Sequence, residues 1–276
     1  MARDLLPLVQ RVLGDKYTIE RQIGRGGAAR VYLARDPAGQ KLALKVLHPE
    51  LKVSVMADRF LREIRLVAQL HHPLIVPVID SGEQDWLVYF VMPYVEGLTL
   101  RDTLDRDRTL SVDATRRLGA ELLDALACAH EADIVHRDVK PANVVMSEAG
   151  AVLLDFGIAR AVAASGRDLL TQSGMTVGTS AYMSPEQVTA EADLDQRSDL
   201  YAVGCVLFEC LAGRPPFTGP NENVVLQLHM HEPPPDVRKY RPETPPALAD
   251  AIARALRKSR PERWQTARDM RNALLG

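Results

Sequence analysis

The hydrophobic period of the sequence changes close to Gly97, and this change limits the fold more than any other feature. Before Gly97, apolar and polar residues mostly alternate, which is the pattern of strands in an antiparallel sheet. One segment interrupts the alternation, because Phe60, Ile64, Val67 and Leu70 recur at helical spacing within residues 56–70. The predicted strands are residues 17–23, 29–36, 41–47, 74–80 and 86–95.

After Gly97 the apolar residues follow a helical period instead. Ser111 is a typical N-cap for a helix over residues 111–132, and the nearly all-apolar residues 198–213 predict a buried helix. Further helices are predicted over residues 246–258 and 266–275. The sequence therefore predicts an α+β, bilobal fold with a ligand cleft at the junction between the lobes. Its parts are a small antiparallel β-sheet lobe plus one helix over about residues 12–93, a hinge over about 93–97, and a larger, mainly helical lobe over 98–276.

Charge and composition exclude several classes of protein. The 276 residues carry a net charge of −2, so no strong field favours nucleic acid or a membrane surface. The most apolar stretch is short and contains Glu209, so we expect no membrane segment in this chain. The N-terminus lacks the apolar core of a signal peptide. Cys128, Cys205 and Cys210 form no metal pattern, which indicates buried thiols in a reducing compartment.

Three glycines, Gly24, Gly26 and Gly27, lie between two predicted strands. A dinucleotide-binding turn would be followed by a helix, and a phosphate-binding P-loop would be followed by Gly-Lys-Ser/Thr; neither follows here. The segment is therefore a glycine-rich hairpin. Taken alone, it is a weak signal, and a plain hairpin turn is the better interpretation.

The next predicted strand carries Lys45, a cation that can reach phosphates held by the hairpin. A lysine among apolar residues needs a counter-charge, and Glu63 on the apolar face of helix 56–70 can supply it. Either residue alone could be an ordinary surface charge. Together they predict an ion pair beside the glycine-rich hairpin.

The segment HRDVKPANVV carries most of the predicted chemistry. Asp138 can accept a hydroxyl proton, Lys140 can neutralise a transferring phosphoryl group, and Asn143 offers a neutral oxygen to a hard cation. Asp155 ends a short apolar strand and is followed by Gly157. Asn143 and Asp155 together supply oxygen ligands of the kind that Mg²⁺ takes alongside substrate phosphates.

This ordered series of motifs resembles the protein kinases, most closely the bacterial Ser/Thr kinases of the actinobacterial receptor type. The resemblance covers about residues 17–275, within a kinase domain assigned to residues 1–276. The motifs are IGRGGAARV, LALK, HRDVKPAN, DFG, GTSAYMSPE and SDLYAVG.

The resemblance implies a role for each matching residue. Lys45, paired with Glu63, would hold the α- and β-phosphates of ATP, and Asp138 would be the catalytic base or orienter, assisted by Lys140. Asn143 and Asp155 would hold Mg²⁺, for which Mn²⁺ could substitute. Glu186 would pair with Arg263, and Asp199 would anchor the catalytic loop. The implied nucleotide-binding residues are Ile23, Gly24, Gly26, Val31, Ala43, Lys45, Met92, Pro93, Val95 and Val145.

Two positions depart from the family pattern. Ala29 stands where the loop has its third glycine, and alanine is the smallest replacement, so we expect reduced loop flexibility with ATP binding retained. Pro93 stands where many relatives carry an acid. The adenine would donate a hydrogen bond to the Pro93 carbonyl and accept one from the Val95 N–H, so the missing N–H of proline does not matter for this contact. Met92 would be the gatekeeper at the back of the pocket.

We therefore predict an active Ser/Thr kinase that also autophosphorylates its activation loop. Lys140 and Thr179 favour Ser/Thr over Tyr as acceptors, since the resembling Tyr kinases lack that lysine. One alternative is a pseudokinase scaffold, which usually lacks the strand lysine, the catalytic aspartate or the metal aspartate; all three are present here. A small-molecule phosphotransferase is disfavoured because residues 155–186 resemble a peptide-docking activation segment.

Regulation and partners are implied in the same way. Thr171 and Ser173, with Thr176 third, would be phosphorylated between molecules and bound by Arg137, whereas Thr179 would be structural. Relatives that select arginine upstream of the phosphosite use glutamates where this chain has Thr99 and Ala142, so we expect little such preference. The resemblance also suggests dimerisation through the N-lobe and a cytoplasmic location, as the kinase domain of a membrane-anchored receptor.

Overall fold

The computed structural model describes residues 5–25, 29–47, 54–85, 87–156, 180–191 and 193–276, without the side chains of residues 54–60. The chain divides into two compact units. The described residues up to Leu70, with Val76–Val95, form the first unit, and His71–Ile75 with the described residues from Glu96 onward form the second. The step from Val95 to Glu96 lies within the predicted hinge.

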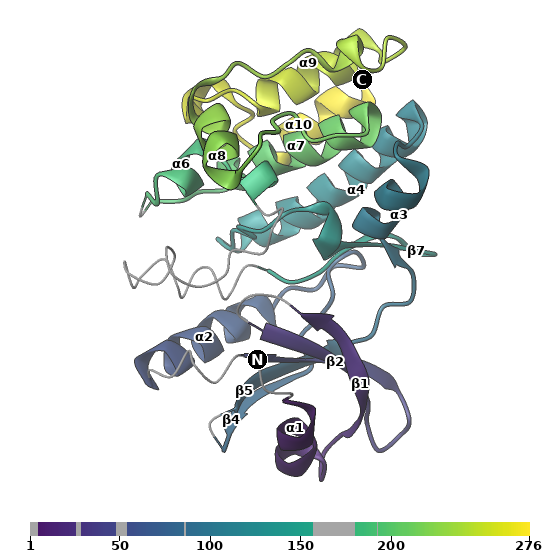
Figure 1. The fold of residues 1–276 in the computed structure, drawn as a ribbon, viewed down its shortest axis with the longest axis vertical. Coiled ribbons are helices and arrows are strands. Elements are labelled where there is room, and N and C mark those ends of the chain that lie inside the picture. Colours follow the sequence, from purple (N-terminus) through teal and green to yellow (C-terminus); the bar gives the residue numbers. More distant parts are fainter. Residues whose placement is uncertain (1–4, 26–28, 48–53, 86, 157–179, 192) are drawn as a thin grey trace. The chain divides into compact units, whose positions relative to one another are not determined.

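The first unit is built on a five-stranded antiparallel sheet with the order β1-β2-β3-β5-β4 (Figure 1). The turn between β2 and β3 is closed by Asp36, whose side chain accepts from the Gln40 N–H at 2.8 Å. The alternating pattern predicts four of its strands, β1, β2, β3 and β5, whereas β4 lies after the segment predicted as a strand. Its strands are β1 (Thr18–Arg25), β2 (Ala29–Arg35), β3 (Lys41–Leu47), β4 (Asp80–Gln84) and β5 (Leu87–Pro93).

Two helices complete this unit. Helix α1 (Leu6–Leu13) buries Val9, Val12 and Leu13 in an apolar cluster with one face of the sheet. Helix α2 (Ser54–Val67) corresponds to the predicted helix over residues 56–70, and Ile64 and Val67 on its predicted apolar face are buried. Burying these apolar surfaces on a sheet is what stabilises both helices.

The prediction of a strand over residues 74–80 is wrong for most of that segment. Only Ile75 makes a bridge, a parallel one to Leu153, and β4 begins at Asp80. Pro77 has no N–H to donate to a ladder, so apolar composition alone did not make this segment a strand. Residues 71–75 belong instead to the second unit, where Leu74 O accepts from Leu153 N at 2.8 Å.

The second unit is mainly helical, and the predicted α+β class is confirmed. A three-stranded sheet contains β6 (Leu98–Thr99), β7 (Val144–Ser147) and β8 (Gly150–Leu153). Its longer helices are α3 (Leu100–Asp107), α4 (Val112–Glu131), α7 (Arg197–Ala212), α8 (Glu222–His231), α9 (Pro246–Ala255) and α10 (Ala267–Leu275). The short elements are α6 (Pro185–Val188) and the 3₁₀ turns Pro141–Asn143, Ser180–Tyr182, Val237–Lys239 and Arg260–Glu262.

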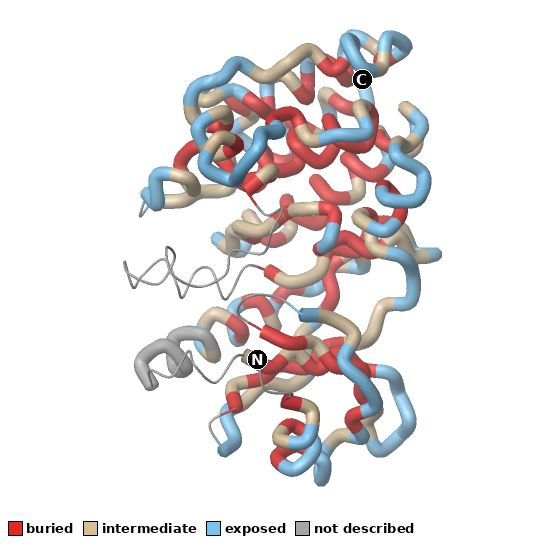
Figure 2. The backbone as a smooth tube through the Cα atoms, in the orientation of Figure 1, coloured by how far each residue is buried: buried red, intermediate tan, exposed pale blue. Residues whose placement is uncertain are grey.

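Helix α7 is the centre of this unit, as its apolar sequence predicts. Every residue from Ser198 to Leu211 is buried (Figure 2). Gly204 lies so close to α9 that an added Cβ would approach the Ala255 Cβ to 2.9 Å. Gly213 ends the helix in the left-handed conformation, with φ of 72°. Within the described part of the chain, no helix is long and apolar enough to cross a membrane.

Candidate active site

The segment between α4 and β7 brings together Asp138, Lys140 and Asn143. Lys140 Nζ lies 2.8 Å from Asp138 Oδ2. The amide nitrogen of Asn143 donates to the same oxygen at 3.0 Å and to the Asp138 carbonyl at 2.8 Å. The Asp138 carboxylate is therefore fixed from two sides, in a position to accept a hydrogen bond from an incoming hydroxyl.

Asp199, near the start of α7, anchors this segment through hydrogen bonds to its backbone. Its two carboxylate oxygens accept the backbone N–H groups of His136 and Arg137, both at 2.8 Å. Arg137 has a φ of 66°, which is costly for a residue with a side chain. The hydrogen bonds to a buried carboxylate offset that cost, and Gln187 Nε2 adds a bond to the Arg137 carbonyl at 2.8 Å.

Histidines on both sides of Asp199 support its charge. Burial opposes ionisation of Asp199, but hydrogen bonds from His130 Nε2 and from the His136 N–H, both at 2.8 Å, outweigh it and lower the pKa of the carboxyl group below its ordinary value. Burial lowers the pKa of His136, which stays neutral. Its Nε2 donates to the Leu154 carbonyl at 2.9 Å, so its Nδ1 can accept from the Asp138 N–H at 3.2 Å.

The predicted metal ligands, Asn143 and Asp155, lie in the same unit and on segments that contact each other. The Asn143 carbonyl accepts from the Leu154 N–H at 2.8 Å, directly before Asp155. Because Asn143 Nδ2 donates to Asp138, Oδ1 is the amide atom left to face a cation. No group of three or more His, Cys, Asp or Glu able to hold a metal occurs among the described residues. A carboxylate with a neutral oxygen fits Mg²⁺, which keeps water or phosphate oxygens as its other ligands.

Five of the ten predicted nucleotide-binding residues lie on one face of the sheet in the first unit. The strand register pairs Gly24 with Val31, Val31 with Lys45, and Ala43 with Met92. Directly paired residues share a face of an antiparallel sheet, as do residues two apart on one strand. These five residues thus form a contiguous patch on the face opposite Tyr32, Leu44 and Val91, which pack with α1.

The remaining nucleotide-binding candidates are distributed between the two units. Ile23 lies on β1, Pro93 ends β5, and Val95 follows it in the first unit. Val145 is buried on β7 of the second unit. Lys45 lies on β3 with its Nζ 5.6 Å from the centroid of the Phe90 ring, and Glu63 lies half-buried on α2. The ion pair between Lys45 and Glu63 stays a prediction.

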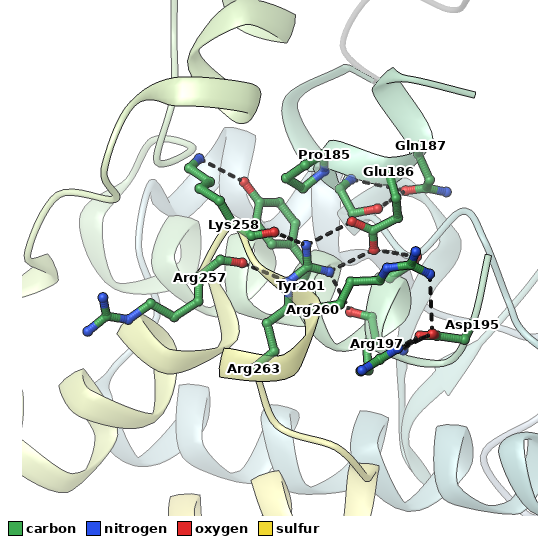
Figure 3. A network of polar contacts seen from close by, with 12 residues as sticks. Pro185, Glu186, Gln187, Asp195, Arg197, Tyr201, Arg257, Lys258, Arg260 and Arg263 are labelled. Atoms are coloured by element: carbon green, nitrogen blue, oxygen red, sulfur yellow. Dashed lines mark hydrogen bonds and ion pairs between the residues drawn. The ribbon is translucent and has the colours of Figure 1, made fainter. Parts of the chain in front are cut away.

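Glu186 and Arg263 form a bidentate ion pair, although 77 residues separate them (Figure 3). The two bonds are 2.7 and 2.8 Å long, and the Arg263 side chain is completely buried. The arginine also donates to the carbonyls of Arg257, Lys258 and Arg197, while Ser198 donates to Glu186 at 2.7 Å. Burial opposes ionisation of Glu186, but the bonds and charge of Arg263 outweigh it and lower the pKa of the carboxyl group.

Sequence reasoning missed one polar cluster in this unit. Glu209 was noted only as a charge within an apolar helix, yet it binds Arg101 and Tyr182. A charged residue in an otherwise apolar, fully buried helix is the signal that could have indicated it. Five other predicted residues, Gly26, Thr171, Ser173, Thr176 and Thr179, lie outside the described residues.

Comparison with known proteins agrees with these observations. The family model described as "Protein kinase domain" matches residues 17–273. A probable serine/threonine-protein kinase of Streptomyces coelicolor is 42% identical over 95% of this chain and 40% of its own length. The serine/threonine-protein kinase PknB of Mycolicibacterium smegmatis is 40% identical over 95% of this chain and 43% of its own length.

A solved structure shows the same fold. The crystal structure of Rad53 in complex with AMP-PNP matches with a TM-score of 0.76 and 24% identity, over 97% of this chain and 67% of that chain. The chain spans only 40% and 43% of the length of the two bacterial relatives, so more than half of each relative lies outside the match.

Proposed function

Because this chain belongs to the protein kinase domain family, we propose that it transfers the γ-phosphoryl group of ATP to serine and threonine hydroxyls of proteins. The bacterial relatives at 40–42% identity are named as serine/threonine-protein kinases, which supports this acceptor class. The single observation that carries the proposal is the arrangement of Asp138, Lys140 and Asn143 on a loop anchored by Asp199.

Each residue of this loop has a task in such a transfer. Asp138 would accept the hydrogen bond of the substrate hydroxyl and take its proton, and Lys140 would stabilise the charge that develops on the phosphoryl oxygens. Lys140 is already held within 2.8 Å of Asp138, so little reorganisation is needed during the reaction. A preformed arrangement of this kind lowers the barrier by positioning.

For the nucleotide we propose ATP with Mg²⁺, with the patch of Gly24, Val31, Ala43, Lys45 and Met92 in the first unit as its binding surface. Asn143 and Asp155 would hold the metal, whose charge would neutralise the phosphate oxygens. The neutral amide oxygen and the carboxylate are ligands of the kind that this ion takes. The adenine would accept from the Val95 N–H and donate to the Pro93 carbonyl, which proline retains.

The substitution Asp138→Asn tests the proposal. It removes the proton acceptor but conserves shape and can keep the contact with Asn143, so phosphotransfer to a protein substrate should fall by at least about 10²-fold. Nucleotide binding, measured by titration calorimetry with a non-hydrolysable ATP analogue, should stay within about twofold of wild type, since Asp138 faces the hydroxyl.

Asp133→Asn is the matched control. Asp133 is exposed, and its φ of 57° lies in a region that asparagine tolerates. This variant should retain full activity. If Asp138→Asn turned over substrate nearly as fast as wild type and the control, Asp138 would not be the residue that accepts the hydroxyl proton.

The pseudokinase alternative remains distinguishable by the same assay. It predicts nucleotide binding without transfer in the wild-type chain. The presence of Lys45, Asp138 and Asp155 in one sequence argues against it.

The wider setting of the domain is part of this proposal. We infer that molecules phosphorylate each other at Thr171, Ser173 and Thr176, that Arg137 binds the resulting phosphate, and that Thr179 contacts the catalytic loop. The relatives are more than twice as long as this chain, which supports a larger parent protein. N-lobe dimerisation and a membrane anchor belong to that parent and rest on resemblance.

A further inference from the structure

The peptide group between Arg137 and Asp138 is held at both of its ends by side chains. On one side, the Asp138 N–H donates to His136 Nδ1 at 3.2 Å. On the other side, the Arg137 carbonyl accepts from Gln187 Nε2 at 2.8 Å. A peptide group rotates as one rigid plane, so its orientation sets the direction in which the next side chain leaves the backbone. These two hydrogen bonds therefore act on the orientation of Asp138, the proposed catalytic base.

This support matters because the backbone is strained at the same point. Arg137 has a φ of 66°, and a conformation of this kind persists only where the surrounding structure holds it. Lys140 and Asn143 hold the Asp138 carboxylate itself, whereas Gln187 holds the backbone that carries it. Loss of the bond from Gln187 would let the peptide group rotate and so move the carboxylate.

The orientation of the Gln187 amide follows from the chemical nature of its two partners. Its Oε1 accepts from the Ser184 N–H at 3.1 Å, so the NH₂ group is the part that faces the Arg137 carbonyl. The contact with Ser184 is half of a capping box at the start of α6, and glutamate serves in such a box as well as glutamine. An ionised carboxylate, however, has no hydrogen to donate to a carbonyl. The contact with Arg137 is therefore the one that requires glutamine.

Gln187 projects from a rigid support. It directly follows Glu186, whose carboxylate forms the bidentate ion pair with the fully buried Arg263 (Figure 3). Gln187 and Asp138 line the same small cavity of the second unit. Helix α6 lies at the end of the predicted activation segment, so the amide connects the end of that segment to the loop that carries the proposed base.

We propose that Gln187 is a positioning residue for phosphoryl transfer, which fixes the peptide group before Asp138 so that the carboxylate meets the substrate hydroxyl. It acts through Asp138 and takes no proton itself. This inference rests on the proposed kinase function, in which Asp138 accepts the hydroxyl proton, and it adds a residue to that site.

Gln187→Glu is the discriminating variant, because it retains the capping contact with Ser184 and removes the donor to the Arg137 carbonyl. Its kcat for a protein substrate should fall by about 10- to 100-fold, since small displacements of a catalytic group have effects of this size. The KM for ATP should stay within about twofold of wild type, and so should the melting temperature remain close to it. A role in the cap alone predicts instead an unchanged kcat.

Gln84→Glu is the matched control. Gln84 lies on β4 of the first unit, and its Nε2 likewise donates to a backbone carbonyl, that of Val12, at 2.9 Å. The substitution removes a bond of the same kind from a strand that the proposed reaction does not use, so kcat should change by less than about twofold. Every variant is first phosphorylated by tagged wild type, which is then removed, so that all are compared in the same state.

A third variant separates the two contacts of the amide. Gln187→Met has a similar shape but removes both the capping contact and the bond to the Arg137 carbonyl. Its kcat should fall as far as that of Gln187→Glu, and its melting temperature should also fall, because a cap contributes to helix stability. This variant provides the kinetic test if Gln187→Glu does not fold.

A second measurement does not depend on turnover. In protein labelled with isotopic nitrogen at aspartate, amide hydrogen exchange at Asp138 reports whether its peptide group stays fixed. The spectrum of Asp138→Asn, which lacks this signal, identifies it. Exchange should be about tenfold faster in Gln187→Glu than in wild type, the change expected for one lost hydrogen bond, and unchanged in Gln84→Glu.

The inference is overturned if Gln187→Glu transfers phosphate as fast as wild type, or if exchange at the Asp138 amide is the same in both proteins. An equal loss of kcat in Gln84→Glu would also overturn it, because the effect would then not be specific to the loop of Asp138. If wild type itself transfers no phosphate, the kinase proposal fails, while hydrogen exchange still decides whether Gln187 fixes this peptide group.

Discussion

At the scale of single residues, the ion pair of Glu186 and Arg263 is a buried, bidentate contact of the second unit. Glu186→Gln should lower the free energy of unfolding by about 3–5 kcal/mol, because it leaves a fully buried guanidinium group without its counter-charge. Urea titration monitored by tryptophan fluorescence measures this. Asp236→Asn, in the exposed pair with Arg238, should cost less than about 1 kcal/mol.

The same pair gives a pH dependence with a definite sign. The folded-state pKa of Glu186 is lowered from 4.5, so its ion pair contributes stability that is fully present above that pH. The contribution is lost as the pH falls through the lowered pKa. The difference in stability between wild type and Glu186→Gln should therefore be constant near pH 7 and shrink below 4.5. A constant difference down to pH 3 would contradict this linkage.

Single residues of the site were predictable where a motif fixes the chemistry. Asp138, Asn143 and Asp155 stand at spacings that leave few other functions, and the structure brings Asp138 and Asn143 into contact. The three-way contact of Glu209, Tyr182 and Arg101 was not predictable in this way. Its members are 27 and 108 residues apart in sequence, and nothing local in the sequence sets that distance.

At the scale of elements, helix α1 has a larger role than its position suggests. The family model begins at residue 17, after α1, yet Val9 and Leu13 are completely buried against the sheet. Leu13→Ala should lower the free energy of unfolding by about 2–5 kcal/mol through lost burial and a cavity. Arg11→Ala, on the exposed face of the same helix, should change it by less than about 0.5 kcal/mol. Equal effects of both substitutions would show that α1 does not pack as described.

Elements with a long, clear period were the ones that sequence predicted well. Helix α7 and strands β1 to β3 lie close to their expected positions because burial enforces their patterns. Helix α3 was missed because only Leu100, Thr103 and Leu104 of its residues are buried, which is too short a stripe to recognise. The wrong strand prediction at residues 74–80 arose because the segment is apolar, although most of its residues do not pair with another strand.

At the scale of the whole molecule, activation should depend on encounters between copies. Phosphorylation at Thr171 or Ser173 adds about −1.5 to −2 charges, which Arg137 would bind. After phosphatase treatment and renewed ATP, wild type should regain activity with a lag that shortens as enzyme concentration rises. The Thr171→Ala/Ser173→Ala double variant should stay slow at every concentration. Equally rapid recovery of the double variant would exclude control through these two residues.

The path of the chain between the two units determines what happens when the polypeptide is divided into two fragments. The backbone enters the helical unit at His71, leaves it after Ile75 and returns at Glu96, and Leu74 is bonded to Leu153 within that unit. A break between Val95 and Glu96 would therefore leave all described residues of the first unit in one fragment, while the other fragment would lack His71–Ile75 of the second unit. The first fragment would carry the five-residue segment His71–Ile75, which belongs to the second unit. In coexpressed fragments, this segment would bind the second unit through contacts such as the hydrogen bond between Leu74 and Leu153. The peptide bond between Val95 and Glu96 is therefore a suitable place to divide the chain for an engineered split kinase.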